Sequence, residues 1–374
     1  MSIEPKWIDD TETLVRELKG LGPDGFSMDT EADSMHHFHE KVCLIQISVP
    51  GVDLLIDPLG DVDLAELGSL LADPARRKIL HGADYDLRML RGDFSFEVRG
   101  LYDTMIAARL SGESAFGLAA LLDKYIGVHL DKRYQRADWS IRPLSGPMLQ
   151  YAASDTRHLD ELAGILEQKL VSLGRVDWAA EEFRRLEQVR PRIQPPLEEA
   201  YIRVKGAGRL DRRALAVLRE IVTLRDGIAS RRDLPRYRVV RDEVLLALAE
   251  GATKGPVDTA RFSGLPRAWR SGQANLTLRE SIEKGLAIPD DELPESLRRV
   301  RPERDRTLEA RVRVLRKERD RLAQELDLDP SILAPRAMLE EISRRLDLDE
   351  DPREIPELRR WQADLLAPAF ERRG

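Results

Sequence analysis

The chain has 374 residues, of which 42% are hydrophobic and 34% charged, and this balance predicts a soluble globular protein of two or three domains. Its single cysteine, Cys43, excludes a disulfide framework and a cysteine-based zinc module within one chain. The formal net charge of −7 does not indicate nucleic-acid binding, although carboxylates gathered at one site can mask a basic face elsewhere.

The location predicted from the sequence is cytoplasmic. The N-terminus (MSIEPKWIDD) is polar and acidic and lacks the basic start and apolar run of a signal peptide. No apolar stretch is long enough to span a membrane, and one cysteine suits a reducing compartment. No obligate protein partner is evident.

Strand-like and helix-like stretches alternate in the first half of the chain. Three hairpin-like strands followed by strand–helix alternation predict a mixed sheet with flanking helices. The expected strands are residues 25–33, 41–49, 52–56 and 78–81, and the expected helices are residues 64–71 and 84–90.

Helical patterns dominate the second half. Residues 148–173 have the spacing of one amphipathic helix, and strand signals disappear from about Tyr151 onward. Proline-rich polar stretches at residues 190–196 and 288–302 are candidate linkers. They separate a large N-terminal block from two smaller, arginine-rich helical blocks.

Two acids, Asp29 and Glu31, occupy alternate positions of the first of these strands. Residues i and i+2 of a strand project from the same face, so the two carboxylates point together. At about 4 Å and an effective dielectric of about 20, their repulsion costs about 4 kcal/mol. Such hard oxygen ligands suit magnesium or manganese. The alternative is a polar strand end, because Asp-x-Glu is a common pattern.

Two further motifs carry acids. In residues 81–87 (HGADYDL), small residues at a strand-to-helix junction allow close backbone approach, and acids in the first helical turn favour the helix dipole. Alone, Asp84 could be an N-cap and Asp86 a first-turn acid. Tyr151 and Asp155, at i and i+4, present a phenol and a carboxylate on one helix face. Taken alone, that pair fits a core tyrosine beside a solvated aspartate.

The order, contexts and separation of the three motifs resemble the DEDD exonuclease superfamily, specifically its tyrosine-bearing branch and the ribonuclease D family. Residues 29–48 (DTEADSMHHFHEKVCLIQIS), 78–90 (KILHGADYDLRML) and 151–159 (YAASDTRHL) look like that family's three exonuclease motifs. Residues 102–104 (YDT) and 138–144 (DWSIRPL) are also similar to it.

This resemblance implies an RNase H-like α/β domain over residues 1–195, with a mixed five-stranded sheet and flanking helices. The family's second-motif aspartate precedes an aliphatic residue, which selects Asp86, before Leu87, over Asp84. The resemblance also implies that two divalent cations, Mg²⁺ or Mn²⁺, are bound and that a tyrosine positions the attacking water. The implied ligands are Asp29, Glu31, Asp86 and Asp155, and the tyrosine is Tyr151.

The activity implied is that of a 3′→5′ exoribonuclease, which releases 5′-mononucleotides from RNA with a free 3′ end by a two-metal-ion mechanism. A tRNA precursor, matured at its 3′ tail, is the substrate that the resemblance suggests. An enzyme alternative is a proofreading-type DNA exonuclease with the same catalytic residues. A non-enzyme alternative is an RNA-binding adaptor with a retired site, but every expected acid is present.

The later chain is similar to HRDC domains, the helical module shared by ribonuclease D and RecQ helicases. Residues 210–250, with their turn at residues 233–235, carry this likeness and imply a first HRDC domain over residues 208–289. Residues 357–366 (ELRRWQADLL) resemble the second such domain of ribonuclease D, expected over residues 297–374.

Arginines of the first helical block are candidate phosphate contacts, which would give sequence-independent, salt-sensitive RNA binding. The alternative is a solvated face with salt bridges. The candidates are Arg209, Arg212, Arg213, Arg232 and Arg236. His36, His37 and His39 suggest a metal cluster, but no fourth ligand is evident, and the rim of a substrate groove or no special role is preferred to zinc.

Overall fold

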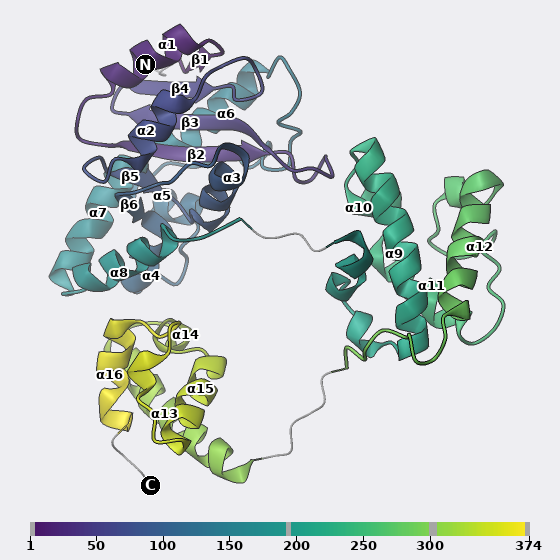
Figure 1. Ribbon diagram of the computed structural model, residues 1–374. Helices are drawn as coiled ribbons and strands as arrows, with labels where there is room; N and C mark the ends of the chain where they lie inside the picture. The colour runs from purple at the N-terminus through teal and green to yellow at the C-terminus, as the bar shows by residue number, and fades with distance from the viewer. Residues whose placement is uncertain (1–3, 192–195, 299–304, 371–374) are drawn as a thin grey trace. The chain divides into compact units, whose positions relative to one another are not determined.

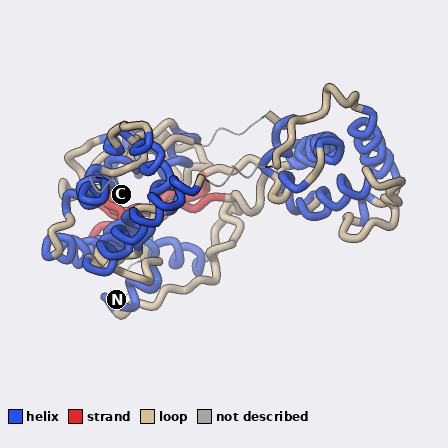
Figure 2. Tube along the Cα trace, turned by 90° about the horizontal axis from the view of Figure 1, so that it is seen from below, coloured by secondary structure: helices blue, strands red, loops and turns tan. Residues whose placement is uncertain are grey.

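The computed structural model describes residues 4–191, 196–298 and 305–370, and its contacts divide them into two units. Unit 1 contains residues 4–32, 42–191 and 305–370, whereas unit 2 contains residues 33–41 and 196–298. Among the described residues, Figure 2 shows strands in unit 1 and helices in both units. Residues 192–195 of the first predicted linker and residues 299–302 of the second lie outside the described residues.

A six-stranded mixed sheet organises unit 1, in the order β1-β4-β3-β2-β5-β6 (Figure 1). Strands β2, β3 and β4 pair antiparallel, while β1 lies parallel to β4, β5 to β2, and β6 to β5. The mixed sheet is confirmed, but the predicted number of five strands is wrong. β1 and β6, for which no strand is predicted from the sequence, have only three residues each, too few to show alternation. The bounds are β1 Lys6–Ile8, β2 Phe26–Ala32, β3 Val42–Val49, β4 Val52–Ile56, β5 Lys78–Leu80 and β6 Leu101–Asp103.

Helices cover both faces of the sheet, with α2 and α6 on opposite sides (Figure 1). Met28, Ile45 and Ile47 share a buried apolar cluster with α1, α2 and α3. On the other face, Leu44 and Leu55 pack with α6. The bounds are α1 Thr11–Gly20, α2 Ala65–Ala72, α3 Asp84–Phe94, α4 Thr104–Leu110, α5 Leu118–Ile126, α6 Gly146–Arg157, α7 Leu159–Ser172 and α8 Val176–Leu186.

The single helix predicted over residues 148–173 is wrong, because the chain forms two helices that meet at His158. The backbone of His158 leaves the helical region, with φ −108° and ψ 4°. The two segments bury their apolar residues in different places. Ala152 and Ala153 of α6 pack on the sheet, whereas Leu162 and Leu166 of α7 join a separate cluster with α4 and α8. The periodicity continues through the bend, so the pattern alone does not reveal it.

The C-terminal helices belong to unit 1. Trp361 stacks on Trp178 of α8 with ring centroids 4.7 Å apart, and Arg359 binds both carboxylate oxygens of Glu182 at 2.9 and 3.0 Å. This packing is hydrophobic as well as ionic, since Trp361 shares a buried cluster with Phe183. The bounds are α13 Arg306–Glu325, α14 Pro330–Leu333, α15 Arg336–Asp347 and α16 Arg360–Phe370.

Unit 2 is built around α9, a 21-residue helix whose apolar residues pack against α11 and α12. Residues 33–41, which connect β2 to β3 in the chain, belong to this unit, and Phe38 packs against its core. In the described ranges of both units, every helix is too short or too polar to cross a bilayer. The bounds are α9 Arg212–Arg232, α10 Arg236–Val239, α11 Asp242–Ala252 and α12 Gly272–Ala287.

Candidate active site

Asp29 and Glu31 lie on the face of β2 that α6 covers. The ladder to β3 pairs Asp29 with Gln46 and Glu31 with Leu44. Residues opposite each other in an antiparallel pair share a face, and Leu44 packs with α6. The intervening residue Thr30 pairs with Ile45, whose side chain joins the cluster on the other face. Strand alternation therefore places both carboxylates beneath α6.

Asp86 and Asp84 differ sharply in their surroundings, although both lie in the first turn of α3. Asp86 is only 7% exposed and accepts a hydrogen bond from the Thr30 hydroxyl. Asp84 binds Arg88 of the same helix, and its side chain is 50% exposed. Of the two, Asp86 is the acid directed toward β2.

Asp103, at the end of β6, fixes the turn that leads into α3. Its buried carboxylate accepts hydrogen bonds from the backbone N–H groups of Gly82 and Ala83, at 3.2 and 2.8 Å. It also caps α4 by accepting from Met105 and Ile106. One carboxylate thus holds the start of α3, three residues before Asp86, against β6.

Helix α6 carries Tyr151 and Asp155 and is bound to the sheet just beyond them. The Thr156 and Ser48 hydroxyls lie 2.6 Å apart, and Ser48 also donates to Asp53. Arg157 donates to Asp53 from Nε and Nη2, at 2.8 and 2.6 Å. These contacts fix the end of α6 over β3 and β4, so the position of Asp155 relative to the sheet is set by its neighbours.

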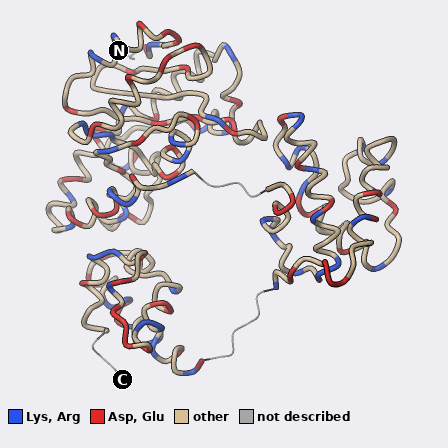
Figure 3. Tube along the Cα trace, in the orientation of Figure 1, with Lys and Arg blue, Asp and Glu red and all other residues tan. Residues whose placement is uncertain are grey.

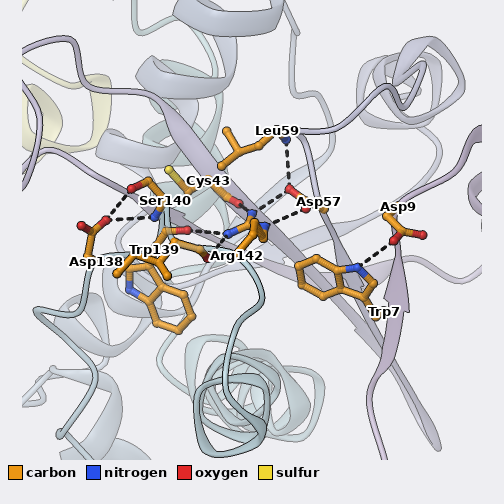
Figure 4. A network of polar contacts seen from close by, with 10 residues as sticks. Trp7, Asp9, Cys43, Asp57, Leu59, Asp138, Trp139, Ser140 and Arg142 are labelled. Carbon is orange, nitrogen blue, oxygen red and sulfur yellow. Dashed lines mark hydrogen bonds and ion pairs between the residues drawn. The ribbon is translucent and has the colours of Figure 1, made fainter. Parts of the chain in front are cut away.

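The segment before α6 is held by one guanidinium group (Figure 4). Arg142 donates to both carboxylate oxygens of Asp57, each at 2.7 Å, and to the carbonyl oxygens of Cys43, Trp139 and Ile141. The fully buried Trp139 packs beside Tyr151, with ring centroids 6.0 Å apart. The Arg142 contacts therefore hold Trp139, and with it the packing on one side of Tyr151.

Asp86 and Asp155 influence the ionisation of Asp29 and Glu31. Burial raises the pKa of Asp29 well above its usual range, and the charges of Asp86, Asp155 and Glu31 raise it further. Burial, followed by the charges of Asp155 and Asp86, likewise raises the pKa of Glu31. Burial also raises the pKa of Asp86 to about 6 and that of Asp155 to about 7. The structure thus brings the four predicted acids into one electrostatic group.

Tyr151 belongs to the same group. Burial raises the pKa of its phenol, and the charges of Asp155, Glu31 and Asp29 raise it further. The phenol therefore stays protonated at neutral pH and can donate a hydrogen bond.

The donor chemistry of this group fits divalent cations. Buried carboxylates that repel each other are relieved by a hard cation with oxygen ligands, such as Mg²⁺ or Mn²⁺. Within residues 4–191, 196–298 and 305–370, no three His, Cys, Asp or Glu side chains are arranged as a ready-made metal site. The fit therefore rests on residue type, burial and mutual repulsion.

The candidate arginines of unit 2 fall into two groups. Arg212 and Arg213 donate to backbone carbonyl oxygens of residues 286–294, and Arg236 binds the buried Asp226 at 2.8 Å. These contacts favour a structural role for the three. Arg209 and Arg232 are exposed, and Figure 3 shows basic residues gathered where α9 leads into α10. RNA contact by these arginines stays a prediction.

The three histidines contact side chains of α9, of α10 and of the turn between them. The Asp233 carboxylate lies 2.7 Å from His37 Nδ1 and accepts from the backbone N–H groups of Phe38 and His39, at 3.0 and 3.1 Å. His39 Nε2 lies 3.2 Å from the Ser230 hydroxyl, and His36 Nδ1 lies 3.3 Å from Arg238. These contacts favour an anchoring role for residues 33–41 within unit 2.

Sequence reasoning did not single out Gln46 or assign a role to Asp103. Asp103 stood in a motif noticed only for its likeness, and its hydrogen bonds to Gly82 and Ala83 join segments about 20 residues apart. Gln46 is a lone polar residue within a run of apolar ones (KVCLIQISV). That interruption was the signal available, because a buried strand otherwise has little reason to contain an amide.

Comparison with known proteins decides the family. The family profile described as 3'-5' exonuclease matches residues 5–171, and that of the HRDC domain matches residues 214–274. Ribonuclease D of Gluconacetobacter diazotrophicus is 32% identical over 362 residues, which cover 96% of this chain and 90% of that protein. Ribonuclease D of Acidiphilium cryptum is 32% identical over 375 residues, covering 97% and 91%.

The chain belongs to the ribonuclease D family. The crystal structure of Escherichia coli RNase D, an exoribonuclease involved in structured RNA processing, matches with a TM-score of 0.73 and 27% identity and covers 99% of this chain and 98% of that one.

Membership of the ribonuclease D family confirms three predictions: the fold class, the presence of an HRDC domain and the activity. The chain is a 3′→5′ exoribonuclease. The DEDD exonucleases to which this family belongs are metal-dependent. One HRDC match falls within the predicted range 208–289. A second HRDC-like domain over residues 297–374 stays a prediction, and so do the residue ranges given for the three domains.

Proposed function

We propose that this ribonuclease D-family enzyme uses Asp29, Glu31, Asp86 and Asp155 to hold two divalent cations, Mg²⁺ or Mn²⁺. The observation that carries this proposal is the placement of Asp29 and Glu31 on one buried face of β2, where burial and the charges of Asp86 and Asp155 raise the pKa of both carboxyl groups. A bound cation would relieve this repulsion. When bound, such ions supply activation of a water molecule and stabilisation of the leaving 3′ oxygen.

The protein's own groups position the reactants. Tyr151 donates its phenolic hydrogen to the attacking water and orients it toward the terminal phosphodiester. Thr30 donates to Asp86 and fixes one carboxylate oxygen, while Asp103 fixes the turn before that residue. Hydrolysis at the terminal linkage releases a 5′-mononucleotide and leaves a new 3′ end, so the same cycle can repeat.

The proposed substrate is a structured RNA with a free 3′ end, and tRNA precursors are the specific candidate. Two observations support it: the similar Escherichia coli enzyme is involved in structured RNA processing, and the HRDC match shows a second module that follows the nuclease domain in the chain. Exposed Arg209 and Arg232 would contact phosphates of the folded RNA. We also propose a cytoplasmic location, which suits the single buried thiol of Cys43.

The deciding experiment incubates the purified protein with a 5′-labelled tRNA precursor that carries a 3′ extension. We expect stepwise shortening from the 3′ end with Mg²⁺ or Mn²⁺ and none with EDTA. A matched DNA strand tests the proofreading alternative, and faster loss of DNA than of RNA would support that rival. Absence of shortening with either metal would favour a non-catalytic RNA-binding adaptor.

A further inference from the structure

Gln46 of β3 is a fully buried side chain with no hydrogen-bond partner in the described part of the chain. Its exposure is 0%, and neither its amide nitrogen nor its amide oxygen is hydrogen bonded to any described residue. Burying an unpaired amide costs free energy that an apolar side chain of similar size would avoid. This cost would be offset if the amide gains a hydrogen-bond partner when the neighbouring site binds its metal ions.

The sheet register identifies that partner. Gln46 stands directly opposite Asp29 in the antiparallel β2–β3 ladder, and opposed residues project on the same face, with their Cβ atoms about 5 Å apart. On its other side, in β4, Gln46 is paired with Leu55, which is apolar and packs with α6. Of the two residues directly opposite Gln46, Asp29 is therefore the one whose side chain can accept a hydrogen bond from this amide.

We propose that Gln46 is a positioning residue of the carboxylate site. When the divalent cations are bound, its side-chain N–H donates to the Asp29 carboxylate and holds it in the orientation that ligates metal. Partners of this kind fix a ligand's rotamer, and their loss typically weakens metal affinity by roughly 10- to 100-fold. This inference rests on the proposed assignment of Asp29 as a ligand.

The test replaces the amide while keeping the length of the side chain. Gln46→Met should weaken Mn²⁺ affinity about tenfold or more, measured from free Mn²⁺ by electron paramagnetic resonance. It should lower kcat with little change in KM, while the stability of the metal-free protein stays equal or rises. The control is Leu44→Met, which introduces the same residue opposite Glu31 with little change of volume and should leave Mn²⁺ affinity within about twofold.

Unchanged Mn²⁺ affinity in Gln46→Met would overturn the proposal, and a loss of metal-free stability alone would show that a buried water satisfies the amide. Asp29→Asn separates this outcome from failure of the site itself. If Asp29→Asn loses Mn²⁺ binding and Gln46→Met does not, only the role of Gln46 is wrong. If Asp29→Asn binds Mn²⁺ and cleaves RNA like wild type, the proposed site is wrong.

A measurement on the wild-type protein covers the case in which Gln46→Met does not fold. With glutamine side chains labelled with ¹⁵N, the Gln46 amide signals should move and become protected from hydrogen exchange when Mg²⁺ is added. Signals that stay unchanged at saturating Mg²⁺ would contradict the proposed hydrogen bond.

Discussion

Arg142 and Asp57 form a bidentate ion pair, with two N–H···O hydrogen bonds of 2.7 Å each. The Asp57 side chain is 9% exposed and the Arg142 side chain 25% exposed, so the pair is largely shielded from water. The same guanidinium donates to three backbone carbonyl oxygens. This relationship ties the segment before α6 to the end of β4, and with it the packing around Tyr151.

Replacing Arg142 with lysine should weaken both the fold and the catalytic rate. A single ammonium group cannot reproduce the planar fork or all the carbonyl contacts. We expect a loss of about 2–3 kcal/mol in the free energy of unfolding, measured with urea, and a severalfold fall in kcat. Lys6→Ala, which removes an exposed ion pair with Glu17, is the control and should change neither quantity measurably. Equal effects of the two variants would contradict this role of Arg142.

Without divalent cations, the acids make unit 1 less stable as the pH rises. Burial raises the pKa of Asp155 to about 7 from an unfolded value of about 4. A group with a raised folded pKa stabilises the fold fully below the unfolded pKa, and this contribution is lost as the pH rises through the folded pKa. The window is therefore about pH 4 to 8.

The prediction compares Asp155→Asn with wild type in EDTA by thermal unfolding across that window. The two should be equally stable near pH 4, and the variant should be more stable at pH 8, by on the order of a few kcal/mol. Adding Mn²⁺ should stabilise wild type more than the variant. A variant that is less stable by the same amount at every pH would mean that Asp155 acts through packing alone.

Tyr151→Phe should lower kcat by about 30- to 1000-fold while KM changes little. The variant keeps the ring packed near Trp139 but loses the hydrogen bond to water, which matters chiefly in the transition state. Single-turnover cleavage across a Mn²⁺ titration measures this. An unchanged rate would assign Tyr151 to the core, and rescue by more Mn²⁺ would make it part of the metal shell.

Replacing both Arg209 and Arg232 with alanine should weaken binding of structured RNA and leave cleavage of short oligomers intact. Each lost phosphate contact should reduce the slope of log K against the logarithm of the salt concentration by about 0.9 in magnitude. The control replaces both Arg212 and Arg213 with alanine. This double variant should destabilise unit 2, because the two side chains donate hydrogen bonds to backbone carbonyl oxygens of that unit. If the variant that lacks Arg209 and Arg232 binds RNA with unchanged affinity at low salt, these two arginines do not contact RNA.

Local patterns were enough to predict the elements that carry the acids. Strand alternation placed Asp29 and Glu31 on one face, and helical spacing placed Tyr151 four residues before Asp155. These regularities depend on residues close together in the chain, and they were enough to predict β2, α3 and the helical state of residues 151–155.

The features that escaped prediction depend on contacts between distant segments. Asp233 binds the backbone of residues 38 and 39, nearly 200 positions earlier, so no local pattern reveals that residues 33–41 belong to unit 2. The bend at His158 follows from packing on two different clusters. Gln46 gains meaning only from its register with Asp29.

The carboxylate site is tested most directly by comparing Asp29→Asn with wild type on linear and circular forms of one RNA in Mn²⁺. Wild type should shorten the linear RNA stepwise from its 3′ end and leave the circle intact, because the circle offers no end to thread. The variant should keep the wild-type circular dichroism spectrum and retain less than about a thousandth of the wild-type rate. Near-wild-type cleavage by Asp29→Asn would contradict the proposed site. Rapid opening of the circle by wild type would contradict the exonucleolytic mechanism.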